Sequence, residues 1–151
     1  MHRALLCLAL FAVASAAVAQ SPDEQAVAAT AERTGATTER VREAANHGCE
    51  SDMSSMNLCA EYLFVVTDRR MNEAYRSALS SHPESKAVRA LIQSQRAWLS
   101  YRNAACEFES SGVKGGSLHA FSSLRCFKAK TELRITELQE YESCNQPGCP
   151  W

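Results

Sequence analysis

Apolar residues recur every three to four positions over long stretches of this chain. From about Ser55 to Ser80, one side of a helix carries Ala60, Leu63/Phe64, Thr67, Met71, Ala74/Tyr75 and Ala78. This spacing predicts a helix with one buried face, and a serine is expected to cap its start. The helix is expected to end before Pro83, because proline disfavours helical backbone at the preceding residue, His82.

A second helix is expected to start with Pro83 in its first turn and to run to about Ser110. Its inward side is expected to carry Val88, Leu91/Ile92, Gln95, Trp98/Leu99, Arg102, Ala105/Cys106 and Glu109. Glycines in the loop from Ser110 to Ser117 allow a tight return. Ser117 is then expected to cap a third helix, which runs to about Glu142. Its expected core positions are Leu118, Phe121, Leu124/Arg125, Lys128, Leu133, Ile135 and Leu138.

Two segments precede the long helices. Residues 21–36 are short of large apolar side chains, so they are expected to bury little surface and to form a flexible or loosely helical leader. Residues 37–48 fit two helical turns, capped by Thr37 or Thr38 and followed by Gly48 as a stop. Because no strand alternation or repeat appears, the sequence predicts an all-α antiparallel helical hairpin bundle of three main helices with a short N-terminal helix.

The first residues have the pattern of a secretory signal. His2 and Arg3 precede an apolar run from Ala4 to Val13, and small residues at 17–19 fit a cleavage site. The run is shorter than the roughly 20 residues of a membrane-spanning helix, so no membrane span is expected after cleavage; a retained amphipathic anchor is the alternative. The expected organisation is a signal peptide at 1–19, a leader at 20–48, a helical domain at 49–142 and a Cys-containing tail at 143–151, in a protein of the periplasm or secreted.

Six cysteines follow the signal: Cys49, Cys59, Cys106, Cys126, Cys144 and Cys149. An even number in an exported chain predicts disulfides that staple the bundle, and the absence of a CxxC pair argues against a metal site, so no metal or cofactor is expected. Counting along the helices brings four of them to one end. One option is a Cys106–Cys126 bond together with a Cys49–Cys59 bond. Cross-pairings among these four cysteines fit the count equally well. The last two cysteines flank a Pro-Gly turn and are expected to close a small loop.

Polar residues at matching heights of the three helices predict a polar layer inside the bundle: Asp68, Asn72, Gln95, Arg102 and Arg134. Asp68 could act as a general acid or base. The favoured interpretation is a buried carboxylate neutralised by arginine, because an unpaired buried charge is very costly. No nucleophile-elbow spacing or free thiol beside a histidine is present, so no enzyme and no catalytic residue is expected.

Charge excludes one class of partner. Without the signal the count is 15 Lys+Arg (16 less Arg3) against 17 Asp+Glu, a formal charge of −2. A nucleic-acid-binding domain would carry a basic footprint, so no nucleic-acid partner is expected.

The order of motifs resembles a known domain. A cysteine about ten residues before "CAEYLFVVTDRRMNEAY" is followed by "QRAWLSYRNAACEFE", by "GGS" and by "LRCFKAKTELRITEL". This order is similar to that of the lysozyme inhibitor LprI-like domain of exported bacterial proteins, from about Cys49 to Leu138. Met71 and Asn103 stand where the family usually has Leu and Asp, which leaves the expected fold intact. The resemblance implies binding and inhibition of lysozyme in the bacterial envelope.

On this resemblance the chain is expected to occlude the cleft of a lysozyme, which cuts between two carboxylates. The loop "SSGVKGGSLH" is the best plug, because Lys114 is a cation on a glycine-rich tip. The candidate binding residues are Lys114, Gly115, Gly116, Ser117 and His119. An ordinary solvated turn is the more frequent explanation of such a loop, and this alternative stays open.

The alternative function is a non-enzymatic envelope interaction or immunity-type module with another partner. Its surface is expected on the exposed face of Arg69, Arg70, Glu73 and Arg76, or on the tail with Pro150-Trp151. A terminal Trp is a typical interface anchor, although a tail Trp also packs against its own bundle.

Overall fold

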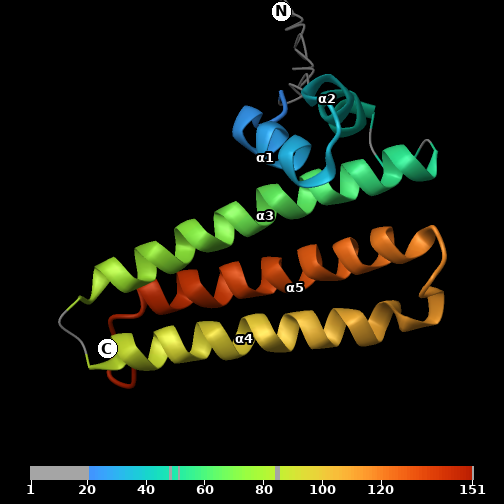
Figure 1. Cartoon of the computed structure of the whole chain (residues 1–151). Coiled ribbons are helices and arrows are strands. Elements are labelled where there is room, and N and C mark those ends of the chain that lie inside the picture. The colour runs from blue at the N-terminus through green and yellow to red at the C-terminus, as the bar shows by residue number, and fades with distance from the viewer. Residues whose placement is uncertain (1–20, 48, 51, 84–85, 151) are drawn as a thin grey trace, which may run out of the picture.

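The computed structural model describes residues 21–47, 49–50, 52–83 and 86–150. Its elements in chain order are α1 (Glu24–Thr34), α2 (Thr38–His47), α3 (Met53–Ser81), α4 (Ala87–Ser110), a short 3-10 helix η1 (Ser111–Val113) and α5 (Leu118–Ser143). Figure 1 labels the α-helices from α1 to α5, and no strand occurs in these ranges. The predicted all-α hairpin bundle is confirmed. The signal peptide, the Gly48 stop and Trp151 lie outside the described residues.

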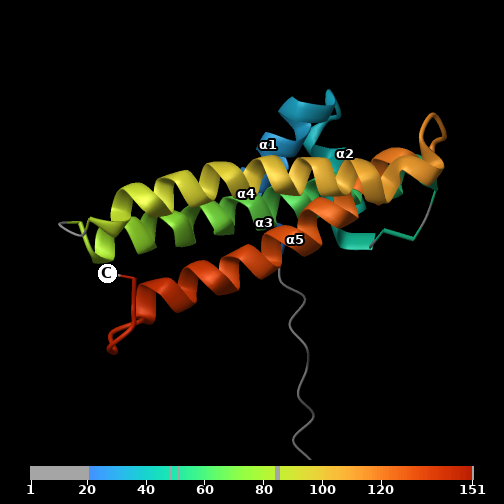
Figure 2. The same ribbon diagram turned by 90° about the horizontal axis from the view of Figure 1, so that it is seen from below.

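The three long helices run back and forth, so α4 is antiparallel to its neighbours and α5 runs parallel to α3 (Figure 1). Side-chain contacts fix this register: the Asn57 Nδ2 donates to the Ser117 carbonyl at 3.5 Å, and the Ser77 Oγ donates to Glu142 at 2.6 Å near the other end. Seen from below, α5 lies to one side of α3 and α4 and not in one plane with them (Figure 2). The helices therefore enclose a common core, which includes Met71, Ala74, Ala78, Leu91, Ile135 and Leu138.

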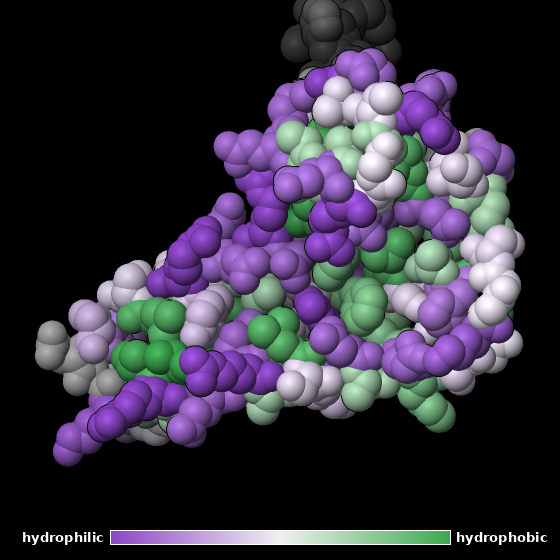
Figure 3. All heavy atoms as spheres, viewed as in Figure 1, coloured by the Kyte–Doolittle hydropathy of each residue, from purple (hydrophilic) through white to green (hydrophobic). Residues whose placement is uncertain are grey.

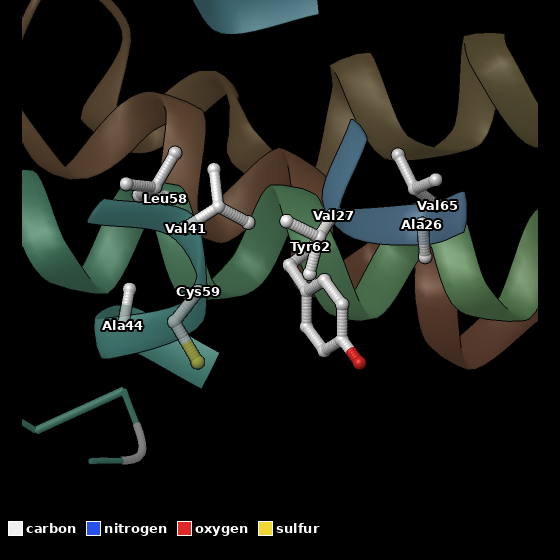
Figure 4. Packing of buried hydrophobic residues seen from close by; sticks show 8 residues of the cluster. All are labelled: Ala26, Val27, Val41, Ala44, Leu58, Cys59, Tyr62 and Val65. Carbon is white, nitrogen blue, oxygen red and sulfur yellow. The ribbon is translucent and has the colours of Figure 1, made fainter. Parts of the chain in front are cut away.

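The N-terminal half of α3 is buried on two sides. Phe64 packs against the ring of Phe127 on α5, with 5.5 Å between centroids, and its neighbour Val65 belongs to a second core beneath α1 and α2. Figure 4 shows this core, in which Val27 of α1 lies beside Tyr62. α5 covers one face of α3, and α1 and α2 cover the adjacent face. The consecutive residues Phe64 and Val65 can therefore both be buried, although they point to different sides of the helix.

Residues 21–36 form an ordered helix, which corrects the expectation of a flexible leader that buries little surface. Ala26, Val27 and Thr30 are fully buried. The Asp23 carboxylate caps α1 by accepting from the Gln25 and Ala26 amides. Small side chains let α1 approach α3 closely, so it buries its face without large apolar residues.

Three helix starts differ from the expectation. The cap of α3 is Asp52 and not a serine: its carboxylate accepts from the Ser54 and Ser55 amides, and its negative charge suits a helix N-terminus. α4 begins at Ala87 instead of Pro83. Ser117 does precede α5, but its side chain makes no capping hydrogen bond.

The inward face of α5 also differs. Leu133 is 68% exposed and Leu118 is 39% exposed, so both were wrongly assigned to the core. The buried side instead includes Thr131 and Arg134. Polar residues that hydrogen-bond inside the bundle are invisible to a count of apolar positions, which shifted the expected face. Figure 3 shows hydrophobic side chains still visible between bands of hydrophilic ones.

The described residues contain three disulfides: Cys49–Cys59, Cys106–Cys126 and Cys144–Cys149. The first ties the connection before α3 to that helix, and the second joins α4 to α5. Of the pairings that stayed open at the sequence level, the structure contains this one, with Cα–Cα distances of 5.4 and 5.5 Å for the two bundle bridges. None of the described helices combines the length and apolar character needed to cross a membrane.

Candidate binding site

The residues of the predicted polar layer lie in the middle of the bundle and form two groups. The first group surrounds Arg102. Its Nη1 donates to the Asp68 Oδ1 at 2.9 Å and to the Thr131 Oγ1 at 3.2 Å. The Asn72 Nδ2 donates to the other Asp68 oxygen at 3.2 Å. Three rings surround the guanidinium at 5.2–5.5 Å, those of Trp98, Phe64 and Phe127. Such rings attract a cation while excluding water from it.

The second group surrounds Arg134. Its Nε donates to the Gln95 Oε1 at 2.9 Å, and its Nη1 donates to Glu137 at 2.7 Å. The Gln95 Nε2 in turn approaches the Met71 Sδ at 2.9 Å. Trp98 lies beside both arginines, 5.8 Å from the Arg134 guanidinium, and so links the two groups.

This arrangement favours the structural interpretation of Asp68 over a general acid or base. Both of its oxygens already accept hydrogen bonds, one from Arg102 and one from Asn72. The Arg102 side chain is only 10% exposed, against 32% for Asp68, so the carboxylate mainly neutralises a buried cation. Among the described residues, no group of three His, Cys, Asp or Glu side chains is placed to hold a metal ion.

The glycine-rich loop is a series of tight turns. Backbone amides of Lys114, Gly116 and His119 each donate to the carbonyl three residues earlier, all at 3.1 Å. Gly115 has a φ of 82°, a left-handed conformation that favours glycine. The short hydrogen-bonded turns hold the tip in one conformation, so the chain can present its side chains at a defined place.

The structure places four of the five candidate binding residues on the exposed tip but turns His119 inward. The His119 Nε2 lies 3.3 Å from the buried Ser110 Oγ, which donates to the Cys106 carbonyl at 2.8 Å. Lys114 is 65% exposed and pairs with the Glu107 carboxylate of α4. The Lys114 ammonium, by hydrogen bond and by charge, holds the pKa of Glu107 below its ordinary value.

Three grooves flank the first two turns of α5, residues 118–125, next to this loop. We call residues 111–125 the loop end. One groove, of about 320 Å³, lies between Asn57, Gly35 and Leu124. Two more, of about 480 and 450 Å³, share Phe121 and Arg125 as a common wall.

Sequence reasoning missed Arg125 as a surface residue, because it assigned Arg125, together with the half-buried Phe121, to the core face. In the structure Arg125 is exposed and its guanidinium lies 5.5 Å from the centre of the Phe121 ring. An aromatic residue and an arginine four positions apart on a helix are neighbours. That spacing, directly after a glycine-rich loop, was the available signal.

The two alternative binding surfaces, the Arg69–Arg76 face of α3 and the tail, already make contacts within the chain. Arg69 pairs with Asp23 at 3.1 Å and also contacts Gln25, so it holds α1 in place. Arg70 and Glu73 line a groove of about 360 Å³ between α3 and α5. At the tail, Pro150 borders an apolar groove of about 220 Å³ with Leu91 and Tyr141.

Comparison with known proteins gives one family. A family model described as "Lysozyme inhibitor LprI" matches residues 44–138, which include α3, α4, the loop end and both bundle disulfides. A protein of Rhizobium meliloti (strain 1021), described as "Uncharacterized protein R02472", is 28% identical over 106 residues, covering 61% of this chain and 76% of that protein. No solved structure matches.

Proposed function

Because the chain belongs to the lysozyme inhibitor LprI family, we propose that it is an exported, non-enzymatic protein that binds a lysozyme or a related muramidase and occludes its cleft. The observation that carries this proposal is the loop end, where an exposed cation on an ordered tip precedes a helix start that is flanked by three grooves. Muramidases of this kind cut between two carboxylates in a cleft. A narrow, positively charged projection is the shape and charge that such a cleft accepts.

Lys114 is the cation at the tip. Its present partner, Glu107, is 55% exposed, and water screens ion pairs between exposed groups, so this pair contributes little to stability. The Lys114 ammonium can therefore leave Glu107 and pair with a carboxylate of the partner. Gly115 and Gly116 leave the tip without bulky side chains, so backbone can enter a narrow cleft.

Export is part of the proposal. Three disulfides within one small domain are typical of proteins that fold in an oxidising compartment. The signal-like pattern of the first residues points the same way. The proposed location is the periplasm or the exterior of the cell.

The test is a lysis assay with the purified mature protein and lysozymes of the c and g types. We expect inhibition at stoichiometric excess, and Lys114→Ala should weaken it about two- to fivefold without lowering the melting temperature. Arg89→Ala is the matched control, because this exposed cation lies on α4 near the opposite end of the bundle. An absence of inhibition at several-fold excess over both enzyme types excludes the proposal.

A second candidate function is interaction with another envelope protein. It is favoured by the groove of about 360 Å³ at Arg70 and Glu73, which lies far along α3 from the loop end. A pull-down from an envelope fraction tests it. This candidate requires a captured protein that Arg70→Glu loses and Lys114→Ala retains.

A further inference from the structure

The cations around the loop end differ in one respect, namely whether a carboxylate of the same chain already holds them. Lys114 pairs with Glu107. Further along α5, the described cations Lys128 and Lys130 pair with carboxylates at 2.7 and 2.9 Å. Arg125 has no carboxylate within ion-pair distance among the residues that the structure describes. Its charge is therefore available to a partner without displacing an internal one.

Arg125 is also held in place before any partner arrives. Its guanidinium lies over the ring of Phe121, 5.5 Å from the ring centre and one helical turn away. Stacking restricts the side chain, so less conformational freedom is lost on binding. A guanidinium can also bind a carboxylate through two parallel hydrogen bonds, which an ammonium cannot do.

Apolar hollows lie on both sides of this stack. The groove of about 480 Å³ includes Met56 and Leu63, and the groove of about 450 Å³ includes Leu118. Leu63 and Leu118 are 36% and 39% exposed, so each offers part of a large apolar side chain to a partner. The site therefore combines one free cation with apolar surface on either side. The acidic residues at the rims are Glu50 and Glu109, and Glu109 is already neutralised by Lys130.

We propose that Phe121 and Arg125 form the anchor of the interface with the partner muramidase. The Arg125 guanidinium binds a carboxylate at the partner's cleft, and an apolar side chain beside that carboxylate enters one of the two hollows. Arginine and aromatic residues in such a setting are the usual centres of binding energy in protein interfaces. This inference rests on the proposed function and names the residue that carries most of its affinity.

Arg125 contributes more than Lys114 for an electrostatic reason. When Lys114 turns to a partner's carboxylate, it leaves Glu107 behind, and that negative charge then repels the incoming one. Arg125 makes no ion pair within the described residues, so binding a partner leaves no carboxylate of its own unpaired. The tip loop thus enters the cleft, and the Phe121–Arg125 stack holds the complex together.

The experiment measures the dissociation constant of the mature, disulfide-bonded protein for lysozyme by isothermal titration calorimetry. Arg125→Ala should weaken binding at least about tenfold, Arg125→Lys by less, and Lys114→Ala by about two- to fivefold. Arg96→Ala is the control, because Arg96 is an exposed cation of α4 away from the loop end and should leave binding unchanged. Equal melting temperatures for all variants exclude a loss of folding.

Three results would overturn the inference. If the native protein binds lysozyme and Arg125→Ala binds within twofold of it, the anchor is wrong and the proposed function stands. If a chitin oligomer bound in the lysozyme cleft leaves the affinity unchanged, the carboxylate is not a cleft carboxylate. If the native protein binds no lysozyme of either type, the proposed function fails and this inference fails with it.

Discussion

Two buried arginines, Arg102 and Arg134, organise the polar interactions inside this bundle. Arg102 is 8% exposed and Arg134 is 3% exposed. Arg102 has hydrogen-bond and ring partners on all three long helices, and Arg134 has partners on α4 and α5. Counting residues from the turns placed these side chains at matching heights, because helical rise is fixed at about 1.5 Å per residue. The rings that enclose Arg102 did not follow from counting, since their direction depends on which face each helix turns inward.

The Asp68–Arg102 pair gives a prediction at this scale. Asp68→Ala should lower the free energy of unfolding by about 2–3 kcal/mol, because it leaves a buried guanidinium without its counter-ion. Urea unfolding monitored by circular dichroism measures the loss. Glu132→Ala is the control, because it removes an exposed i, i+4 ion pair with Lys128 and should cost under about 0.5 kcal/mol. Equal losses in the two variants would mean that the burial of Arg102 does not increase the contribution of the Asp68–Arg102 pair to stability.

The tip loop gives a second prediction through its glycines. Gly115→Ala should lower the free energy of unfolding by about 1–2 kcal/mol, because its φ of 82° is strained for any residue with a Cβ. Gly112→Ala is the matched control: a Cβ there meets no atom within 4 Å and the backbone is not left-handed. It should leave stability unchanged or raise it slightly. The melting temperatures of the two variants are compared. A loss in Gly115→Ala alone indicates backbone strain, and equal losses indicate a general need for glycine in the loop.

At the scale of elements, the three long helices were predictable because each repeats apolar residues at helical spacing over more than six turns. α1 was not, because its buried face consists of small residues, Ala26, Val27 and Thr30, whose fit depends on the partner helix. The loop end shows the same limit. Its glycines predicted a turn, but the exposure of Arg125 depends on how α5 is rotated relative to α3, which apolar counting predicted incorrectly.

Docking of α1 onto α3 gives a prediction for that element. Val27→Ala should lower the free energy of unfolding by about 1–2.5 kcal/mol, since Val27 is fully buried beside Tyr62. Glu32→Ala is the control for helix propensity, because Glu32 is exposed on the same helix. A Val27→Ala variant as stable as the Glu32→Ala variant would indicate that α1 is not docked in solution.

For the molecule as a whole, the covalent staples are unequally distributed. Cys49–Cys59 and Cys106–Cys126 both lie in the half that carries the loop end. At the end with the α3–α4 turn, Cys144–Cys149 only closes a loop within the tail, and the long helices there pack around residues such as Met71 and Leu138. Staples at one end keep the grooves and the tip in fixed positions relative to one another. Such preorganisation lowers the conformational cost of binding a partner.

The disulfides therefore should differ in their contribution to stability. Replacing Cys106 and Cys126 together by alanine should cost about 3 kcal/mol, since their bond closes a loop of 20 residues. Replacing Cys144 and Cys149 together should cost about 2 kcal/mol or less, because their bond closes a loop of only five residues at an exposed tail. Urea unfolding of the two double variants measures the difference. A reversed order would show that the tail contributes to the packed core.

The pH dependence of stability follows from carboxylates that the fold keeps charged. The pKa values of Glu24, Asp52 and Glu107 are lowered, chiefly by side-chain hydrogen bonds from Arg42, Ser55 and Lys114, respectively. A group whose pKa is lower in the folded than in the unfolded chain stabilises the fold fully above the unfolded value, near pH 4, and loses that contribution as the pH falls through the folded value.

The urea midpoint should therefore be nearly constant between pH 7 and about pH 5 and should fall between about pH 5 and pH 3. Added salt separates the causes, because it screens the exposed pairs of Glu24 and Glu107 with their cations but leaves the Ser55 hydroxyl bond to Asp52 in place. At high salt the acid-induced fall should become smaller without vanishing. A midpoint that rises on acidification would mean that these carboxylates repel one another more strongly than their partners hold them. In that case repulsion among the surface carboxylates, and not their ion pairs, would determine how the free energy of unfolding changes at low pH.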